Sequence, residues 1–171
     1  MAKKKTSLRE FQEHLAARLS SAAQGQTKTT LLGFQAGHDN WVLNLSDSGE
    51  IVPLPTLAPV PLTKPWFAGI ANIRGNLYSV ADFSAFRGGE PTPLNAASRL
   101  LLVGTRQGSN AALLVTRLLG LKNPEMFSPD AAGEESPPWE SDRLVDGEGR
   151  RWKKLNVREL LADPRFMEIG A

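Results

Sequence analysis

The chain has 171 residues, of which 41% are hydrophobic and 22% are charged, as in a globular protein with one sizeable core or two small cores that share a boundary. Its 20 basic and 18 acidic residues leave a net charge of only +2, which does not indicate binding to a polyanion. The absence of cysteine excludes disulfides, thiolate metal sites and cysteine nucleophiles.

The first 27 residues predict a basic tail and an amphipathic helix. Ser7 and Glu10 have the spacing of a capping box, and apolar residues follow at helical spacing at positions 8, 11, 15 and 19. We expect this helix to pack on its own domain, with docking to a partner as the alternative. The basic start lacks the apolar centre of a signal peptide, and no apolar run reaches the roughly 20 residues that span a bilayer. We therefore expect a soluble, cytoplasmic protein.

From Lys28 the pattern changes to short β-prone runs separated by turn residues. Runs at 29–35 and 41–45 flank the turn sequence AGHDN, and SGEIVPLP adds another short strand. The segment TLAPVPLTKP has too many prolines for a helix interior, so we expect it to run extended over the surface. The segment PWFAGIANIRGNLYSV then predicts two strands around a tight turn, with Arg74 as the single cation at its tip.

The second half continues with short strands. The clearest pair covers residues 100–103 and 111–115, and RRWKKLNV predicts a later strand. Residues 127–142 are rich in acidic, proline and small residues, so we expect a mobile loop or a loosely packed crossover. Asn156 and Glu159 predict the start of a short helix that ends at residues 163–164. Many short strands with little helix between them argue for antiparallel barrels or a sandwich.

Residue types that carry catalysis or bind metals form no recognisable motif. The His38–Asp39 pair lies in turn sequence and has no metal-ligand spacing. Serine-hydrolase, phosphate-binding and dinucleotide motifs are absent, although paired carboxylates could still meet in the fold of a hydrolase without a motif. RRWKK at 150–154 is the one candidate for nucleic-acid binding, and a strand that covers a core tryptophan explains it equally well.

The segment TKPWFAGIANIRGNLYSVADF resembles the signature hairpin of the chemotaxis coupling family, the CheW-like domain. The matching features are Pro65–Trp66, Gly69–Ile70, Asn72–Ile73–Arg74–Gly75, Leu77–Val80 and Asp82–Phe83. Flanking strands and the closing helix also agree, so the resemblance covers roughly residues 28–162. The N-terminal extension and Tyr78 are similar to the twitching-motility (PilI-like) branch. The sequence departs from the family at Ser79, which is usually proline, and at Thr116–Arg117, which are often Val-Asp.

The resemblance implies an all-β fold of two small five-stranded SH3-like barrels packed on a shared apolar seam, with an N-terminal helix and a short C-terminal helix. Residues 1–27 would be the tail and amphipathic helix, 28–162 the coupling domain and 163–171 a C-terminal tail. The implied function is a non-catalytic adaptor that couples a chemoreceptor to a histidine kinase and controls type IV pilus twitching motility. A small β-barrel RNA-binding protein is the alternative.

The implied partners are the regulatory domain of a CheA-like histidine kinase and the cytoplasmic tip of a methyl-accepting chemoreceptor. No cofactor, metal or nucleic acid is implied, and membrane association would come only through the receptor array. The implied partner-binding residues are Glu50, Asn72, Arg74, Gly75 and Asn76.

Gly75 permits positive φ, which would fix the direction of Arg74. A fixed arginine loses little entropy on binding, and its planar fork suits a carboxylate or backbone carbonyls on a receptor helix. The alternative role for Arg74 is an internal ion pair with Glu50. The two roles are compatible, because such a pair can orient the arginine.

Overall fold

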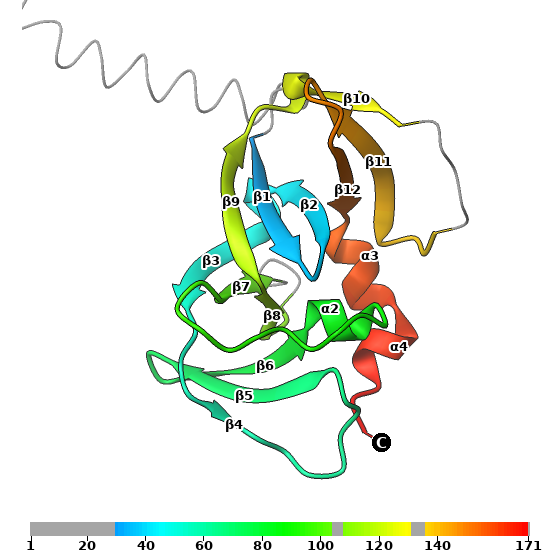
Figure 1. Ribbon diagram of the computed structural model, residues 1–171. Coiled ribbons are helices and arrows are strands. Elements are labelled where there is room, and N and C mark those ends of the chain that lie inside the picture. The colour runs from blue at the N-terminus through cyan, green and yellow to red at the C-terminus, as the bar shows by residue number, and fades with distance from the viewer. Residues whose placement is uncertain (1–29, 104–107, 131–135, 171) are drawn as a thin grey trace, which may run out of the picture.

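The computed structural model describes residues 30–103, 108–130 and 136–170 (Figure 1). The helix expected within residues 1–27 lies outside these ranges. The strands are β1 (Leu31–Ala36), β2 (Asp39–Asn44), β3 (Ser48–Pro53), β4 (Leu57–Ala58), β5 (Phe67–Ile73), β6 (Asn76–Asp82), β7 (Arg99–Val103), β8 (Ala111–Val115), β9 (Arg117–Lys122), β10 (Phe127–Pro129), β11 (Glu140–Asp146) and β12 (Arg151–Leu155). The helices are η1 (Leu45–Asp47), α2 (Phe83–Phe86), η3 (Pro124–Met126), α3 (Val157–Ala162) and α4 (Pro164–Met167).

The strands form two six-stranded sheets, which appear as the upper and lower lobes of Figure 1. The first sheet has the order β10-β11-β12-β2-β1-β9, and the second has the order β3-β7-β8-β6-β5-β4. The second sheet is therefore inserted into the first along the chain, between β2 and β9. Each sheet contains one parallel pair, β12 with β2 and β6 with β8, and the other pairs are antiparallel. The pairing is therefore mainly antiparallel, as the short strands predict, and departs from that pattern at these two places.

Each sheet is bounded by two strands that follow one another in the chain. In the second sheet the chain leaves β3 at one edge and enters β4 at the other edge after only residues 54–56. Prolines at 53 and 55 suit this bend, because proline cannot donate to a sheet ladder. The pair β9 and β10 does the same in the first sheet. If β3 and β4 are counted as one bent strand, and β9 and β10 as another, each barrel has five strands, in agreement with the expected architecture. The two strand orders then correspond position by position.

One apolar cluster joins the two barrels and forms the shared seam. It contains Phe34 and Trp41 from the first barrel, Phe83 from α2, Leu113 from β8, and Trp139. The Trp41 ring centroid lies 4.9 Å from that of Phe83 and 6.2 Å from that of Trp139. A separate cluster fills the inside of the second barrel, so β7 and β8 are buried on both faces. This explains why their sequences are continuous apolar runs and not alternating ones.

The segment at 136–142 corrects the expectation of a mobile or loosely packed region. Trp139 and Glu140 are only 3% and 4% exposed, and β11 begins at Glu140. The indole N–H of Trp139 donates to Asp163 Oδ2 at 2.9 Å, which ties the segment to the C-terminal helices. One large aromatic side chain buries enough apolar surface to outweigh its acidic and small neighbours. Residues 131–135 of this segment lie outside the described ranges.

The C-terminal helices follow the predicted capping. The Asn156 side chain accepts a hydrogen bond from the backbone N–H of Glu159 at 3.1 Å, as the sequence predicts. Asp163 ends α3, but it also caps α4, which the sequence analysis did not anticipate. Phe166 of α4 is buried and stacks on Trp66 with ring centroids 5.9 Å apart. The chain after residue 163 therefore packs back on the second barrel.

Candidate partner-binding site

The turn between β5 and β6 consists of Arg74 and Gly75, with φ values of +51° and +85°. Positive φ at both central residues is the requirement of a type I′ hairpin turn, whose twist matches that of the flanking strands. The N–H of Gly75 donates to Asn72 Oδ1 at 2.9 Å and closes the turn. The positive φ predicted for Gly75 is confirmed. The sequence analysis did not anticipate that Arg74 shares this conformation, which is unfavourable for an L-residue with a side chain.

Arg74 forms a bidentate ion pair with Glu50. Its Nη1 donates to Glu50 Oε2 at 2.7 Å, and its Nη2 donates to Glu50 Oε1. Glu50 lies on β3, 24 residues earlier, and the arrangement of the barrel brings β3 beside the hairpin. The Arg74 side chain is nevertheless 67% exposed. The predicted internal ion pair is therefore present, and the guanidinium still faces solvent.

The ion pair keeps both partners charged. The hydrogen bond from Arg74 lowers the pKa of Glu50 below its ordinary value, and the hydrogen bond to Glu50 raises the pKa of Arg74. Glu50 occupies two of the five N–H donors of the guanidinium. The remaining donors can bind carbonyl or carboxylate oxygens of another molecule in a direction that Glu50 fixes.

The surroundings of the tip combine polar and apolar groups. Asn72 and Asn76 are exposed at the ends of the two strands. Leu77 is 60% exposed and lies opposite Asn72 in the sheet register. The sequence analysis did not single out Leu77. The alternation of β6, with Tyr78 and Val80 packed inward, would have identified it as an apolar residue on the outer face.

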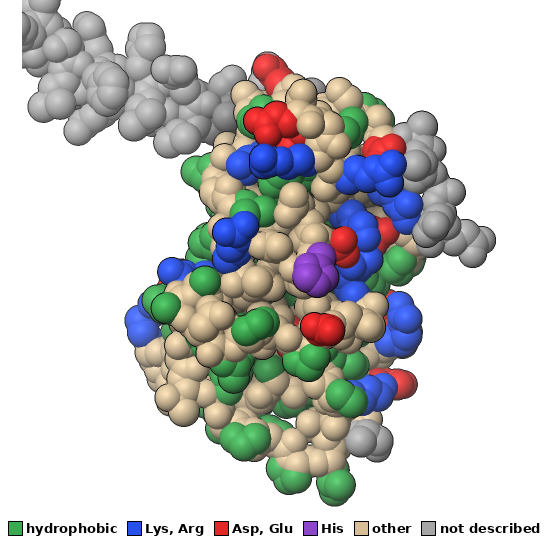
Figure 2. All heavy atoms as spheres, viewed as in Figure 1, with side chains coloured by type: hydrophobic (Ala, Val, Ile, Leu, Met, Phe, Trp, Pro, Cys, Tyr) green, Lys and Arg blue, Asp and Glu red, His purple; other side chains and the backbone are tan. Residues whose placement is uncertain are grey.

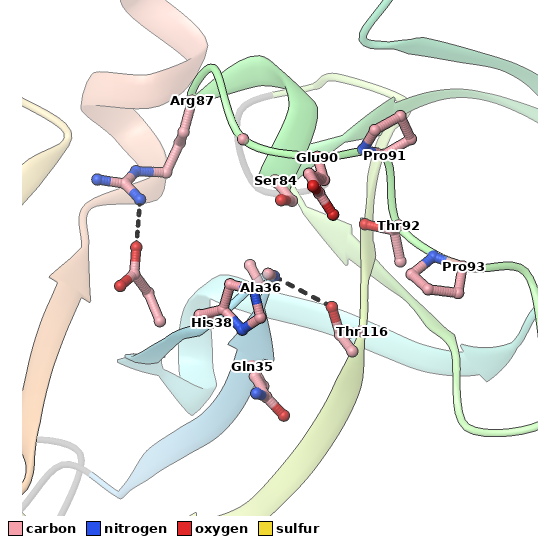
Figure 3. A pocket seen from close by; sticks show the side chains of 13 residues that line it. Gln35, Ala36, His38, Ser84, Arg87, Glu90, Pro91, Thr92, Pro93 and Thr116 are labelled. Atoms are coloured by element: carbon pink, nitrogen blue, oxygen red, sulfur yellow. Dashed lines mark hydrogen bonds and ion pairs between the residues drawn. The ribbon is translucent and has the colours of Figure 1, made fainter.

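A pocket of about 520 Å³ lies between the two barrels (Figure 3). The first barrel contributes the β1–β2 turn, and the second contributes α2 and the loop that follows it. The labelled side chains that line the pocket are Gln35, Ala36, His38, Ser84, Arg87, Glu90, Pro91, Thr92, Pro93 and Thr116. The space-filling view shows the waist between the lobes where these elements meet (Figure 2). Within the described ranges, no group of three or more histidine, cysteine or acidic side chains could hold a metal ion.

The pocket wall depends on a close backbone contact between the barrels. Gly37 has φ +63°, and a Cβ atom there would lie 2.8 Å from Ser84 Oγ. The N–H of Gly37 donates to Thr116 Oγ1 at 3.1 Å. Thr116 is one of the positions at which the sequence departs from the family pattern. Its hydroxyl fixes the β1–β2 turn against the start of β9.

A cluster of charged residues beside the pocket also joins the barrels. Arg87, which caps α2, donates to Asp39 Oδ2 at 2.7 Å and to Glu140 Oε1 at 2.9 Å. Its guanidinium lies 4.8 Å from the Trp41 ring centroid. Lys153 Nζ is 3.5 Å from Asp39 Oδ2 and 4.0 Å from Glu140 Oε1. The sequence analysis missed this cluster, because no local motif connects partners 48 and 53 residues apart.

The arrangement of aromatic side chains bears on the nucleic-acid alternative. Trp152 is 4% exposed, packs on Phe127, and donates its indole N–H to Asp146 Oδ2 at 2.9 Å. This hydrogen bond lowers the pKa of Asp146. Every phenylalanine, tyrosine and tryptophan in the described ranges is buried or half-buried. Single-strand binding surfaces stack bases on exposed rings, so the strand RRWKK is better explained as the cover of a core tryptophan.

Across the described residues, no helix is long and apolar enough to cross a membrane.

Comparisons with known proteins show the family of this chain. The model of the CheW-like domain matches residues 30–165. Protein PilI of Pseudomonas aeruginosa is 31% identical over 161 residues, which cover 91% of this chain and 88% of PilI. The crystal structure of the scaffolding protein TtCheW from Thermoanaerobacter tengcongensis is similar, with a TM-score of 0.68 and 17% identity over 82% of this chain and 92% of that one. The last likeness concerns the fold alone. The chain belongs to the CheW-like family.

Proposed function

We propose that this protein is a non-catalytic adaptor that couples a chemoreceptor to a histidine kinase in a bacterial chemosensory system, and that this system controls type IV pilus twitching motility. Membership of the CheW-like family supports the scaffolding role. The similarity to PilI supports the assignment to a pilus system. The proposal places the protein in the cytoplasm, associated with the membrane only through the receptor array.

The observation that carries the proposal is the exposed Arg74 on a closed hairpin turn. Asn72 and Gly75 hold the turn, and Glu50 holds the guanidinium. Binding through a group that is already fixed loses less conformational entropy than binding through a mobile side chain. Arg74 would contact a carboxylate or backbone carbonyls of a partner helix, with Asn76 beside it.

An adaptor that binds two partners at once needs two separate surfaces. The hairpin tip is one candidate. The pocket between the barrels is the second, because it combines apolar surface from Ala36, Pro91 and Pro93 with many polar and charged side chains, and such a groove suits an amphipathic helix. We assign this pocket to receptor helices. The partners would be the cytoplasmic tip of a chemoreceptor and the regulatory domain of a CheA-like kinase.

Calorimetry with the purified full chain tests the proposal. The titrants are the regulatory domain of a CheA-like kinase and the cytoplasmic fragment of a chemoreceptor from the same organism. We expect Arg74→Ala to weaken binding of at least one of them by tenfold or more, as is usual for an interface hot spot. Arg158→Ala is the matched control, because Arg158 is an exposed arginine on α3.

Thermal melts of the same variants separate binding from stability. We expect Arg74→Ala to melt within about 2 °C of the wild type, because its side chain is mostly exposed. If the wild type binds neither partner, the adaptor proposal is wrong. If Arg74→Ala loses stability together with binding, Arg74 is a structural brace and the interface lies elsewhere. Salt-sensitive, sub-micromolar binding of a random oligonucleotide would support the RNA-binding alternative.

A further inference from the structure

The loop between β4 and β5 exposes an apolar side chain to solvent on a backbone of unfavourable conformation. Leu62 has φ +61° and is 86% exposed, the largest value among the exposed large hydrophobic residues of the described ranges. A positive φ is uncommon for any residue other than glycine, and an exposed leucine forfeits the free energy that burial would release. Backbone strain of this kind is concentrated at functional sites. The feature therefore suggests that Leu62 is buried by another molecule.

Backbone contacts hold this loop in place. The N–H of Lys64 donates to the carbonyl of Ile169 at 2.8 Å, and Thr63 pairs with Gly170 in an isolated antiparallel bridge. The Thr63 hydroxyl donates to the carbonyl of Val60 at 2.9 Å. Leu62 is thus exposed on a fixed backbone, which makes it a suitable anchor for binding.

An apolar pocket of about 320 Å³ opens beside the same loop. Its apolar lining comes from Trp66, Phe67, Ala81, Ala111, Phe166, Met167 and Ile169, and three polar residues, Ser79, Ser109 and Asn110, complete it. Ile169 is also the residue whose carbonyl holds the loop. Hydrophobic side chains gather at the lower end of the molecule, where the β4–β5 loop and the C-terminus lie (Figures 1 and 2). We call the surface formed by residues 60–65 and 166–170 the loop face.

The loop face also carries one charge of each sign. Lys64 Nζ lies 3.7 Å from Glu168 Oε2, and the Glu168 side chain is 73% exposed. An interface between two identical copies around a two-fold axis needs a surface that is complementary to itself. A protruding leucine, an apolar pocket and two opposite charges on one face meet this requirement, because each group finds its counterpart on the second copy.

We propose that two copies of this protein dock through their loop faces in a symmetric dimer. Leu62 of each copy enters the apolar pocket of the other, and Lys64 of each copy faces Glu168 of the other. This self-association is separate from the proposed function. It uses the end of the second barrel and leaves the pocket between the barrels uncovered.

Sedimentation velocity of the full chain over a concentration series tests the proposal. We expect the mass to rise from the monomer value of 18.6 kDa toward about twice that value. Leu62→Gly removes the anchor, and glycine accepts the positive φ, so the fold is retained. We expect this variant to self-associate at least tenfold more weakly. Leu94→Ser is the matched control, because Leu94 is 65% exposed but lies outside the loop face.

Charge reversal identifies the symmetry of the contact. Lys64→Glu and Glu168→Lys should each weaken self-association, because like charges then face one another across the two-fold axis. An equimolar mixture of the two variants should regain association, because both contacts become attractive again. A role confined to the pair within one molecule would not give this rescue.

Three outcomes would overturn the proposal. The wild type could remain monomeric up to about 1 mM, the weak limit of a specific affinity. Leu62→Gly could associate as strongly as the wild type, which would place the contact elsewhere on the chain. The mixture of charge variants could fail to regain association. If the wild type is monomeric and Leu62→Gly loses only the binding of the kinase regulatory domain, the loop face is a binding surface for the kinase and not for a second copy.

Discussion

Arg87→Met tests whether the charged cluster between the barrels stabilises the fold. The substitution removes the guanidinium but keeps an unbranched apolar stem against Trp41. Glu140 is then left with fewer counter-charges, although its side chain is only 3% exposed. A buried carboxylate that loses its partner retains the cost of desolvation without the compensating attraction.

The size of the effect follows from the remaining neighbours. A hydrogen bond to a charged group contributes about 1.5–3 kcal/mol, and Arg87 makes two of them. Arg143 at 3.4 Å and Lys153 at 4.0 Å stay beside Glu140, so the upper range for a broken buried pair is not reached. We expect a loss of about 3 kcal/mol in the free energy of unfolding, which lowers the melting temperature by about 6–12 °C.

Urea denaturation followed by tryptophan fluorescence measures this loss, because the Arg87 guanidinium lies over the Trp41 ring. Arg158→Met is the control and should leave the unfolding free energy within about 0.5 kcal/mol. Arg87→Lys should recover only part of the loss, since an ammonium lacks the fork that reaches both Asp39 and Glu140. A loss below about 1 kcal/mol for Arg87→Met would refute the reasoning that Arg87 compensates the buried charge of Glu140.

Three further predictions concern the core, a helix cap and the hairpin turn. Trp139→Ala should cost about 3–5 kcal/mol in urea denaturation, and a cost typical of a surface site would contradict the placement of Trp139 in the seam. Burial raises the pKa of Asp163, but hydrogen bonds from Arg165 and Trp139 outweigh it, so the pKa in the folded protein is lowered. The stabilisation by Asp163 is therefore complete above the ordinary aspartate pKa and is lost as the pH falls through the lowered pKa of the folded protein. At pH 7, Asp163→Ala should have a free energy of unfolding about 1 kcal/mol below that of the wild type. If this difference between the two proteins did not narrow in acid, the prediction would be contradicted. Because Arg74 has φ +51°, Arg74→Gly should melt at a higher temperature than Arg74→Ala, while both lose partner binding, and the reverse melting order would argue against strain at this position.

The features predicted correctly are those that local sequence determines. A two-residue turn with glycine, flanked by apolar strands, predicts the β5–β6 hairpin and the positive φ of Gly75 without reference to the rest of the chain. The cap at Asn156 is equally local. The Arg74–Glu50 pair was expected from the family resemblance, because nothing in the intervening residues indicates that β3 lies beside the hairpin.

The features that were missed depend on how the barrels close and pack. Trp139 lies in an acidic, proline-rich stretch, and only the aromatic partners supplied by β2 and α2 make it a core residue. Arg87 and Glu140 are 53 residues apart and meet only because α2 packs on the first barrel. The parallel pairs β12–β2 and β6–β8 also join distant segments. Short-range patterns carry no information about such contacts.

The connections between the barrels determine how an adaptor of this fold could transmit a signal. Only η1 separates β2 from β3, and only Thr116 separates β8 from β9. Flexible movement between domains needs longer linkers and a small, polar interface, whereas here the seam is a continuous apolar cluster reinforced by Arg87. The hairpin tip, the pocket between the barrels and the loop face are therefore held at fixed positions relative to one another. Under the proposed function, the protein would couple receptor and kinase by fixing the geometry in which they meet. Arg87→Met would weaken this coupling both by loosening the seam and by changing a side chain that lines the pocket assigned to receptor helices, while leaving Arg74 intact.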